Sequence, residues 1–141
     1  MRAADSLDSL HLLTYHIYTD GSLQPCSTAG HSSRMDTSWI LEDSNIFFIC
    51  TTTGFFSSTR AELLAILTAL LALPESTSAV IHTDSKAAID CVTPLLSNLW
   101  LSTRQWFAAN NKSLLGAIVA TIKSKQLHIT LHKVKVHSDI W

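Results

Sequence analysis

Three acidic side chains, those of Asp20, Glu62 and Asp84, lie within otherwise apolar segments of the chain. Three carboxylates gathered beside an apolar core would repel one another and raise one another's pKa values unless a cation neutralised them. Hard oxygen ligands of this kind favour Mg²⁺ or Mn²⁺. The joint pattern therefore predicts a divalent-metal site.

Each of these residues also has an ordinary structural explanation. Asp20 precedes Gly21, a pair typical of a turn. Glu62 can be the return partner in a capping box that begins at Thr59. Asp84 can be the N-cap of the helix that follows it. These alternatives stay open for each residue taken alone.

The elements that position the three residues follow from the local pattern. Residues 14–19 form a β-rich run that stops at Asp20, so a strand is expected there. Residues 59–73 are apolar on nearly every face, which predicts a helix buried against a sheet and ended by Pro74. Residues 79–83 predict a short strand. Because open α/β sheets place their sites beyond the carboxyl ends of strands, the three carboxylates are expected to converge.

The rest of the chain supplies further elements. Strands are expected over residues 29–35 and 46–52, joined by a polar turn over 42–45. After the strand at 79–83, a helix is expected over 86–93, interrupted by Pro94. Two more helices are expected, over 95–109 with Trp100 and Trp106 inside it, and over 113–125. The last strand is expected over 127–136, with a change of alternation at Lys133 that a bulge would produce. This order predicts an α/β fold with a mixed sheet.

Composition limits the class of protein. The chain has 141 residues, of which 47% are hydrophobic and 15% charged, with a net charge of -1. These values indicate one compact domain and exclude a disordered or fibrous chain. The longest apolar stretch, residues 63–73, is too short to cross a bilayer. Residues 1–10 resemble neither a secretory signal nor a transit peptide, so we expect an intracellular protein, in the nucleus or the cytoplasm.

Cysteine and histidine spacing gives no sign of a zinc site. The 3 cysteines lie far apart, and the 7 histidines show neither HExxH nor zinc-finger spacing. The sequence thus offers little support for transition-metal ligation.

Charge is distributed unevenly along the chain. Residues 1–94 carry four basic and ten acidic side chains, a net charge of -6, whereas residues 95–141 carry six basic and one acidic, a net charge of +5. The basic part is suited to a polyanion. The candidate phosphate contacts are Arg104, Lys112, Lys123 and Lys125, with an ordinary solvated surface as the alternative.

Four short motifs occur in a fixed order. They are Tyr-Thr-Asp-Gly-Ser at 18–22, Ser-Thr-Arg-Ala-Glu-Leu-Leu-Ala-Ile at 58–66, His-Thr-Asp-Ser-Lys at 82–86, and His-Lys-Val-Lys-Val-His-Ser at 132–138. In order and spacing they resemble the ribonuclease H family, especially the copies carried by retrotransposon reverse transcriptases. The resemblance covers residues 14–138.

This resemblance implies a mixed five-stranded sheet, with three antiparallel strands followed by parallel strands, flanked by helices. It implies an endonuclease that cleaves the RNA strand of RNA/DNA hybrids, with Asp20, Glu62 and Asp84 as catalytic metal ligands for Mg²⁺ or Mn²⁺. In the family a histidine after the last strand assists proton transfer or product departure, which here is His137. An exposed loop histidine is the alternative for that residue.

The resemblance also implies a substrate surface. Lys86 falls where the family contacts the substrate, and the backbone of Gly21 and Ser22 is placed to recognise the 2′-hydroxyl group that distinguishes RNA from DNA. Two metal ions about 4 Å apart can activate a water and stabilise the leaving 3′-oxygen.

The chain also departs from the family pattern. Family members continue into a final helix with the motif NExAD, whose aspartate is the fourth catalytic carboxylate, whereas this chain ends at Trp141. Val136 replaces the usual glycine, and Asp139 lies too close to His137 to take the aspartate's role. We therefore expect an N-terminal extension over 1–13 and a ribonuclease H-like domain over 14–141 that lacks the C-terminal helix.

Three functional hypotheses follow. The first is a ribonuclease H enzyme, either weakened by the truncation or a fragment of a longer polyprotein in which a reverse transcriptase domain is its partner. The second is a catalytically impaired remnant of a retroelement that still binds hybrids. The third is a related transposase or integrase nuclease, although such enzymes lack the motif at 132–138.

Overall fold

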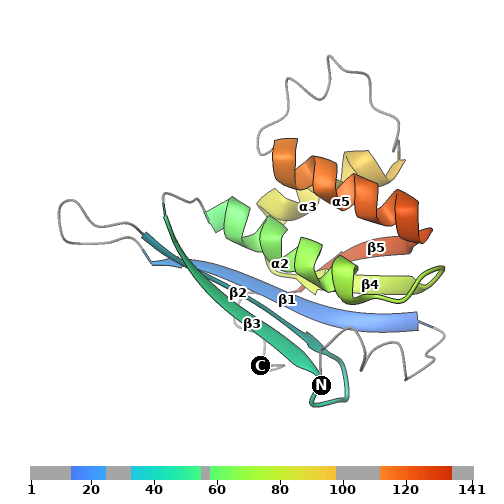
Figure 1. Cartoon of the computed structure of the whole chain (residues 1–141), viewed down its shortest axis with the longest axis horizontal. Coiled ribbons are helices and arrows are strands. Elements are labelled where there is room, and N and C mark those ends of the chain that lie inside the picture. Colours follow the sequence, from blue (N-terminus) through green and yellow to red (C-terminus); the bar gives the residue numbers. More distant parts are fainter. Residues whose placement is uncertain (1–13, 25–32, 55–57, 98–111, 135–141) are drawn as a thin grey trace.

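The computed structural model describes residues 14–24, 33–54, 58–97 and 112–134. Five strands form a single sheet in the order β3-β2-β1-β4-β5, and three helices lie together on one face of it (Figure 1). Neighbouring strands β3, β2 and β1 are antiparallel, whereas β1, β4 and β5 are parallel. The predicted mixed sheet is therefore confirmed. The elements are β1 (Thr14–Gln24), β2 (Ser33–Leu41), β3 (Phe47–Gly54), α2 (Ser58–Ala72), β4 (Ser78–Thr83), α3 (Lys86–Ser97), α5 (Lys112–Lys125) and β5 (His128–Lys133).

Strand β1 is longer than its local sequence indicated. It continues through Asp20 and Gly21, which pair with Ser38 and Thr37 of β2. The predicted end of the strand at Asp20 is therefore wrong. Pairing with the long antiparallel neighbour β2 outweighs the preference of both residues for turns.

Strand β2 continues past the predicted end at residue 35, as far as Leu41. Alternate residues from Met35 to Leu41 are buried against the helices, including Trp39, which is 1% exposed. Residues 25–32, which include the predicted start at residue 29, lie outside the described part of the chain. The polar turn between β2 and β3 is confirmed: the Ser44 hydroxyl donates to the Leu41 carbonyl and accepts from the backbone N–H of Ile46.

The first two helices follow the main features of the prediction, with one correction. Helix α2 is buried along most of its length, and the chain leaves it just before Pro74. Helix α3 contains Pro94, so the predicted interruption there is wrong. Pro94 and Asp90, whose carbonyl loses its helical partner, are both exposed, so water can replace the missing hydrogen bond.

The last strand is shorter than the predicted 127–136. It pairs with β4 over consecutive residues from His128 to Lys133 without an inserted residue, so there is no bulge within the paired strand. Val134 still donates its N–H to the Thr83 carbonyl. Residues 135 and 136 lie outside the described residues, as do Trp100, Trp106 and most of the helix expected over 95–109.

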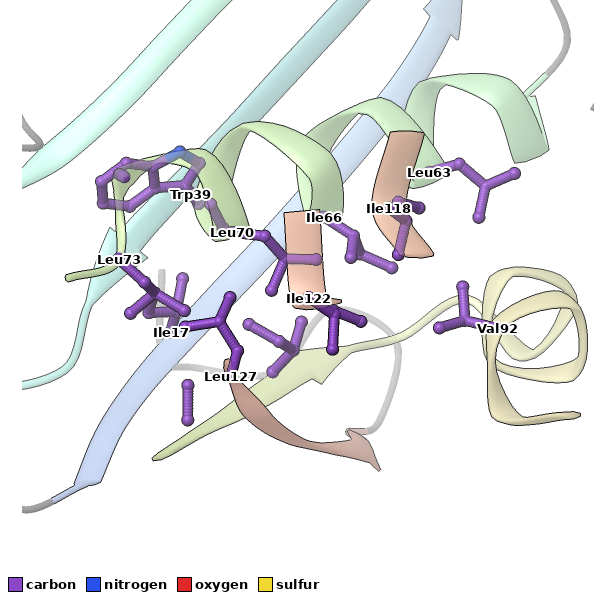
Figure 2. Close-up of a cluster of buried hydrophobic side chains, with 14 of the residues drawn as sticks. Ile17, Trp39, Leu63, Ile66, Leu70, Leu73, Val92, Ile118, Ile122 and Leu127 are labelled. Atoms are coloured by element: carbon purple, nitrogen blue, oxygen red, sulfur yellow. The ribbon is translucent and has the colours of Figure 1, made fainter. Parts of the chain in front are cut away.

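The core fills the space between the sheet and the helices. Helix α2 packs on β1 and β2, and α5 packs on α2. Figure 2 shows the side chains of this layer, which come from β1, β2 and all three helices. Its labelled members are Ile17, Trp39, Leu63, Ile66, Leu70, Leu73, Val92, Ile118, Ile122 and Leu127. None of the helices in the described ranges is long and apolar enough to span a bilayer.

Candidate metal centre

The register of two parallel strands brings Asp20 and Asp84 together. Pairing of β1 with β4 ends at Tyr18 and His82, which lie opposite each other. Each aspartate lies two residues beyond this last pair, so the two side chains leave neighbouring strands at the same level of the sheet. Glu62 approaches from the first turns of α2, which packs on β1. One ligand oxygen from each of the three carboxylates lies within 4.8 Å of the others.

Glu62 is the most buried of the three carboxylates, with 7% of its surface exposed. The Thr83 hydroxyl donates to its Oε2 at 3.5 Å, and the backbone N–H of Gly21 also donates to its carboxylate. Burial, and then the charges of Asp20 and Asp84, raise the pKa of Glu62 to about 8. The carboxyl group is therefore largely protonated at pH 7 when no cation compensates the charge.

The ordinary structural explanations fail for all three residues. Asp20 lies within a paired strand and not in a turn. Ser85, not Asp84, caps α3, because the Ser85 hydroxyl accepts from the backbone N–H of Ala88. Glu62 directs its carboxylate towards β1 and β4, as its hydrogen bonds to Gly21 and Thr83 require. The fold thus positions three carboxylates together without using them as caps or turns.

The donor set fits a hard divalent cation. All three residues of the cluster supply carboxylate oxygens, the ligands that Mg²⁺ and Mn²⁺ prefer. Burial raises the pKa of Glu62 most, and the negative charges of Asp20 and Asp84 raise it further. A cation at this place would remove that repulsion.

The remaining predicted site residues lie around this cluster, with one exception. Gly21 is half-buried and follows Asp20 directly, whereas Ser22 is exposed on β1. Lys86 is exposed at the first position of α3. His137 lies outside the described residues, so its predicted role remains a prediction.

The predicted phosphate contacts are only partly placed. Arg104 lies outside the described residues, whereas Lys112 begins α5 and Lys123 belongs to its last turn. For Lys125 the structure shows a different partner: its Nζ donates to the carbonyls of Leu71 and Leu73 at 2.6 and 2.7 Å, and its phosphate contact stays a prediction. This ammonium group binds the C-terminal end of α2, opposite to the end that carries Glu62.

Thr83 is a site residue that the sequence reasoning did not identify. Its hydroxyl donates to Glu62 and also accepts from the backbone N–H of Ser85. It thereby connects a carboxylate of the cluster to the turn that follows β4. Its position directly before Asp84 was the available signal, but the local sequence does not show that Glu62 is its partner.

Comparisons with known proteins agree with this architecture. A family model described as RNase H matches residues 14–140. Among 116 matching chains of solved structures is a foamy viral protease-reverse transcriptase in complex with dsDNA. The match has a TM-score of 0.59 at 23% sequence identity and covers 88% of this chain and 84% of the viral chain. At this identity the similarity concerns the fold. No curated protein sequence matches the chain.

Proposed function

The chain belongs to the ribonuclease H family, a family of hydrolytic nucleases, and on this basis we propose that it cleaves the RNA strand of RNA/DNA hybrids. The observation that carries the proposal is the cluster of Asp20, Glu62 and Asp84, whose oxygens lie within 4.8 Å of one another. A purely structural domain has no need to gather three carboxylates where burial and their mutual repulsion raise the pKa of one of them.

We assign the binding of Mg²⁺ or Mn²⁺ to these three residues. When bound, two such ions would activate the attacking water and stabilise the leaving 3′-oxygen in an in-line displacement. Asp20 and Asp84 hold their carboxylates on neighbouring strands, so the sheet fixes the spacing between them. A bound cation would lower the pKa of Glu62, which burial and its neighbours raise, so Glu62 would then hold the metal as a carboxylate.

The substrate would lie along the exposed residues beside the cluster. Ser22 and Lys86 are both exposed, one on β1 and one at the start of α3. Lys86 supplies a positive charge for a phosphate, and the backbone near Gly21 and Ser22 would meet the 2′-hydroxyl group. His137 would assist proton transfer or product departure. A reverse transcriptase domain is the expected partner, in keeping with the reverse transcriptase to which the similar viral chain belongs.

The direct test is cleavage of a labelled hybrid. The purified chain would be incubated with an RNA/DNA hybrid and with duplex DNA and duplex RNA of the same sequence, in Mg²⁺ and in Mn²⁺. Asp20→Asn removes one metal ligand with little change in shape. Asp90→Asn is the matched control, because Asp90 is an exposed carboxylate on α3 outside the cluster.

We expect cleavage of the RNA strand of the hybrid alone, dependent on the metal, lost in Asp20→Asn and kept in Asp90→Asn. Cleavage that survives Asp20→Asn would contradict the assignment of the cluster. A folded chain that binds the hybrid without cleaving it would support the alternative function, an impaired hybrid-binding remnant. In that case, adding a C-terminal NExAD helix should restore activity.

A further inference from the structure

Three histidines form a continuous row across the sheet. His16 lies on β1, His82 on β4 and His132 on β5, three strands that are neighbours in the sheet. Nδ1 of His16 lies 3.1 Å from Nε2 of His82, and Nδ1 of His82 lies 3.0 Å from Nδ1 of His132. The row lies on the face of the sheet opposite α2, since it alternates with Ile17 and Ile81, which are buried in the core. The carboxylate cluster does not include these residues.

The central imidazole is held firmly in place. His82 is 9% exposed, and its ring stacks on Tyr18 with ring centroids 4.4 Å apart and an interplanar angle of 13°. His132 approaches its Nδ1 from the side, with the ring planes at 84°. Nε2 of His82 is thus directed at His16, which is half-buried, while His132 is exposed.

From this arrangement we propose a second metal site, for a borderline divalent cation, Zn²⁺ foremost, between Nδ1 of His16 and Nε2 of His82. Imidazole nitrogens suit Zn²⁺, Ni²⁺ and Cu²⁺, whereas Mg²⁺ prefers oxygen ligands. Two nitrogens bound to tetrahedral Zn²⁺ at their usual bond lengths lie about 3.3 Å apart. The observed separation of 3.1 Å is close to this value.

His132 serves as the positioning residue of this site. A histidine that binds a metal through one nitrogen nearly always donates its other N–H to an acceptor, which fixes the ring and its tautomer. His82 has such a partner in Nδ1 of His132. In the bound state His82 would carry its proton on Nδ1 and His16 on Nε2, which leaves Nε2 of His82 and Nδ1 of His16 to bind the metal.

The carboxylate of Glu42 lies near the row and favours a cation between His16 and His82. The backbone N–H of Glu42 donates to the His16 carbonyl at 2.8 Å. Its carboxylate accepts from the Tyr18 hydroxyl at 3.1 Å, so it lies beside the ring that stacks on His82. Glu42 is exposed, and its negative charge beside the row would attract a cation.

Zinc binding to the histidine row can be measured apart from nuclease activity. The chain would be kept in excess Mg²⁺, which occupies oxygen sites, and titrated with Zn²⁺ by calorimetry. His16→Asn removes one proposed ligand. His128→Asn is the matched control, because His128 is an exposed histidine at the other end of β5 whose side chain is not part of the row.

We expect His16→Asn to abolish one Zn²⁺ equivalent and His128→Asn to leave it intact. His132→Asn should weaken the same equivalent by about tenfold or more, as loss of an orienting partner does. In the unmodified chain, Zn²⁺ should shift the imidazole ¹⁵N resonances of His16 and His82 and not those of His128, a measurement that does not depend on whether a variant folds. Equal binding by His16→Asn and the unmodified chain, or unmoved His16 and His82 resonances, would overturn the proposal.

Discussion

Gly21 lies directly against the backbone of Glu62. A Cβ atom on Gly21 would lie 2.5 Å from the Glu62 nitrogen and 2.6 Å from the Ala61 carbonyl oxygen. The N–H of Gly21 also donates to the Glu62 carboxylate. The absence of a side chain at position 21 therefore lets α2 approach β1 closely enough to bring Glu62 to the two aspartates.

Gly21→Ala should consequently destabilise the fold. The new methyl group would meet backbone atoms that cannot rotate away, so α2 must move, and such overpacking costs about 1–3 kcal/mol. Gly116→Ala is the control, because a Cβ atom there has no neighbour within 4 Å and Gly116 lies inside α5. We expect that control to stabilise the protein by about 0.5–1 kcal/mol. Urea unfolding of both variants checks the pair, and equal effects would contradict the close contact.

Glu62 should make the metal-free protein less stable at alkaline pH. Its pKa is raised from 4.5 to about 8 in the folded state, so over this range the folded chain holds a proton that the unfolded chain has released. This contribution is fully present below pH 4.5 and is lost as the pH rises through about 8. Glu62→Gln should therefore gain stability over the unmodified chain as pH increases, and match it near pH 4.5.

Unfolding by urea in the presence of a chelator, at several pH values, measures this difference. Asp90→Asn is again the control, since Asp90 is exposed and lies outside the cluster. A stability difference between Glu62→Gln and the unmodified chain that does not change with pH would show that burial does not raise the pKa of Glu62.

Binding of Mg²⁺ should release protons at pH 7. The cation binds the ionised form of Glu62, whose pKa in its absence is about 8, so up to about one proton leaves for each protein that binds. Calorimetry in two buffers with different ionisation enthalpies measures the number of protons. Glu62→Gln should remove the buffer dependence, and a buffer-independent heat in the unmodified chain would contradict the prediction.

Lys86 and Lys125 should differ in their effect on hybrid binding. Lys86 is exposed beside the cluster, so Lys86→Met should lower the slope of log affinity against log salt by about one. Lys125 donates to the carbonyls of Leu71 and Leu73, so Lys125→Met should leave that slope unchanged. Binding titrations at several salt concentrations measure the slopes. An equal decrease of the slope in both variants would show that Lys125 also contacts the nucleic acid.

Lys125→Met should act instead on stability. Its ammonium group satisfies carbonyls at the C-terminal end of α2, where a positive charge also interacts favourably with the helix dipole. We expect a loss of about 1.5–3 kcal/mol, typical of a hydrogen bond to a charged group. Thermal unfolding measures this change, and an unaltered melting temperature would contradict it.

The differences between prediction and structure have a common origin in non-local contacts. Asp20 and Gly21 have the local preference of a turn, yet β2 pairs with them and β1 continues. Pro94 has the local preference of a helix end, yet α3 continues past it. In both cases packing and pairing with distant segments outweigh a preference that amounts to a few kcal/mol at most.

The histidine row also could not be predicted from local sequence. His16, His82 and His132 are separated by 66 and 50 residues, and no spacing rule connects them. They meet because β1, β4 and β5 pair in parallel in one particular register. A shift of that register by one residue would turn a histidine to the opposite face.

The amino-acid sequence by itself determined the family, the order of the main elements and the three carboxylates. Each of these depends on residue types at short range: four motifs in order, and apolar runs with the period of a strand or a helix. Only the tertiary structure decided that Tyr18 pairs with His82, that Gly21 lets α2 approach β1 closely, and that the pKa of Glu62 is raised. Strand register and helix packing are set by contacts between segments far apart in the chain, and burial and electrostatic repulsion arise only once those segments have met.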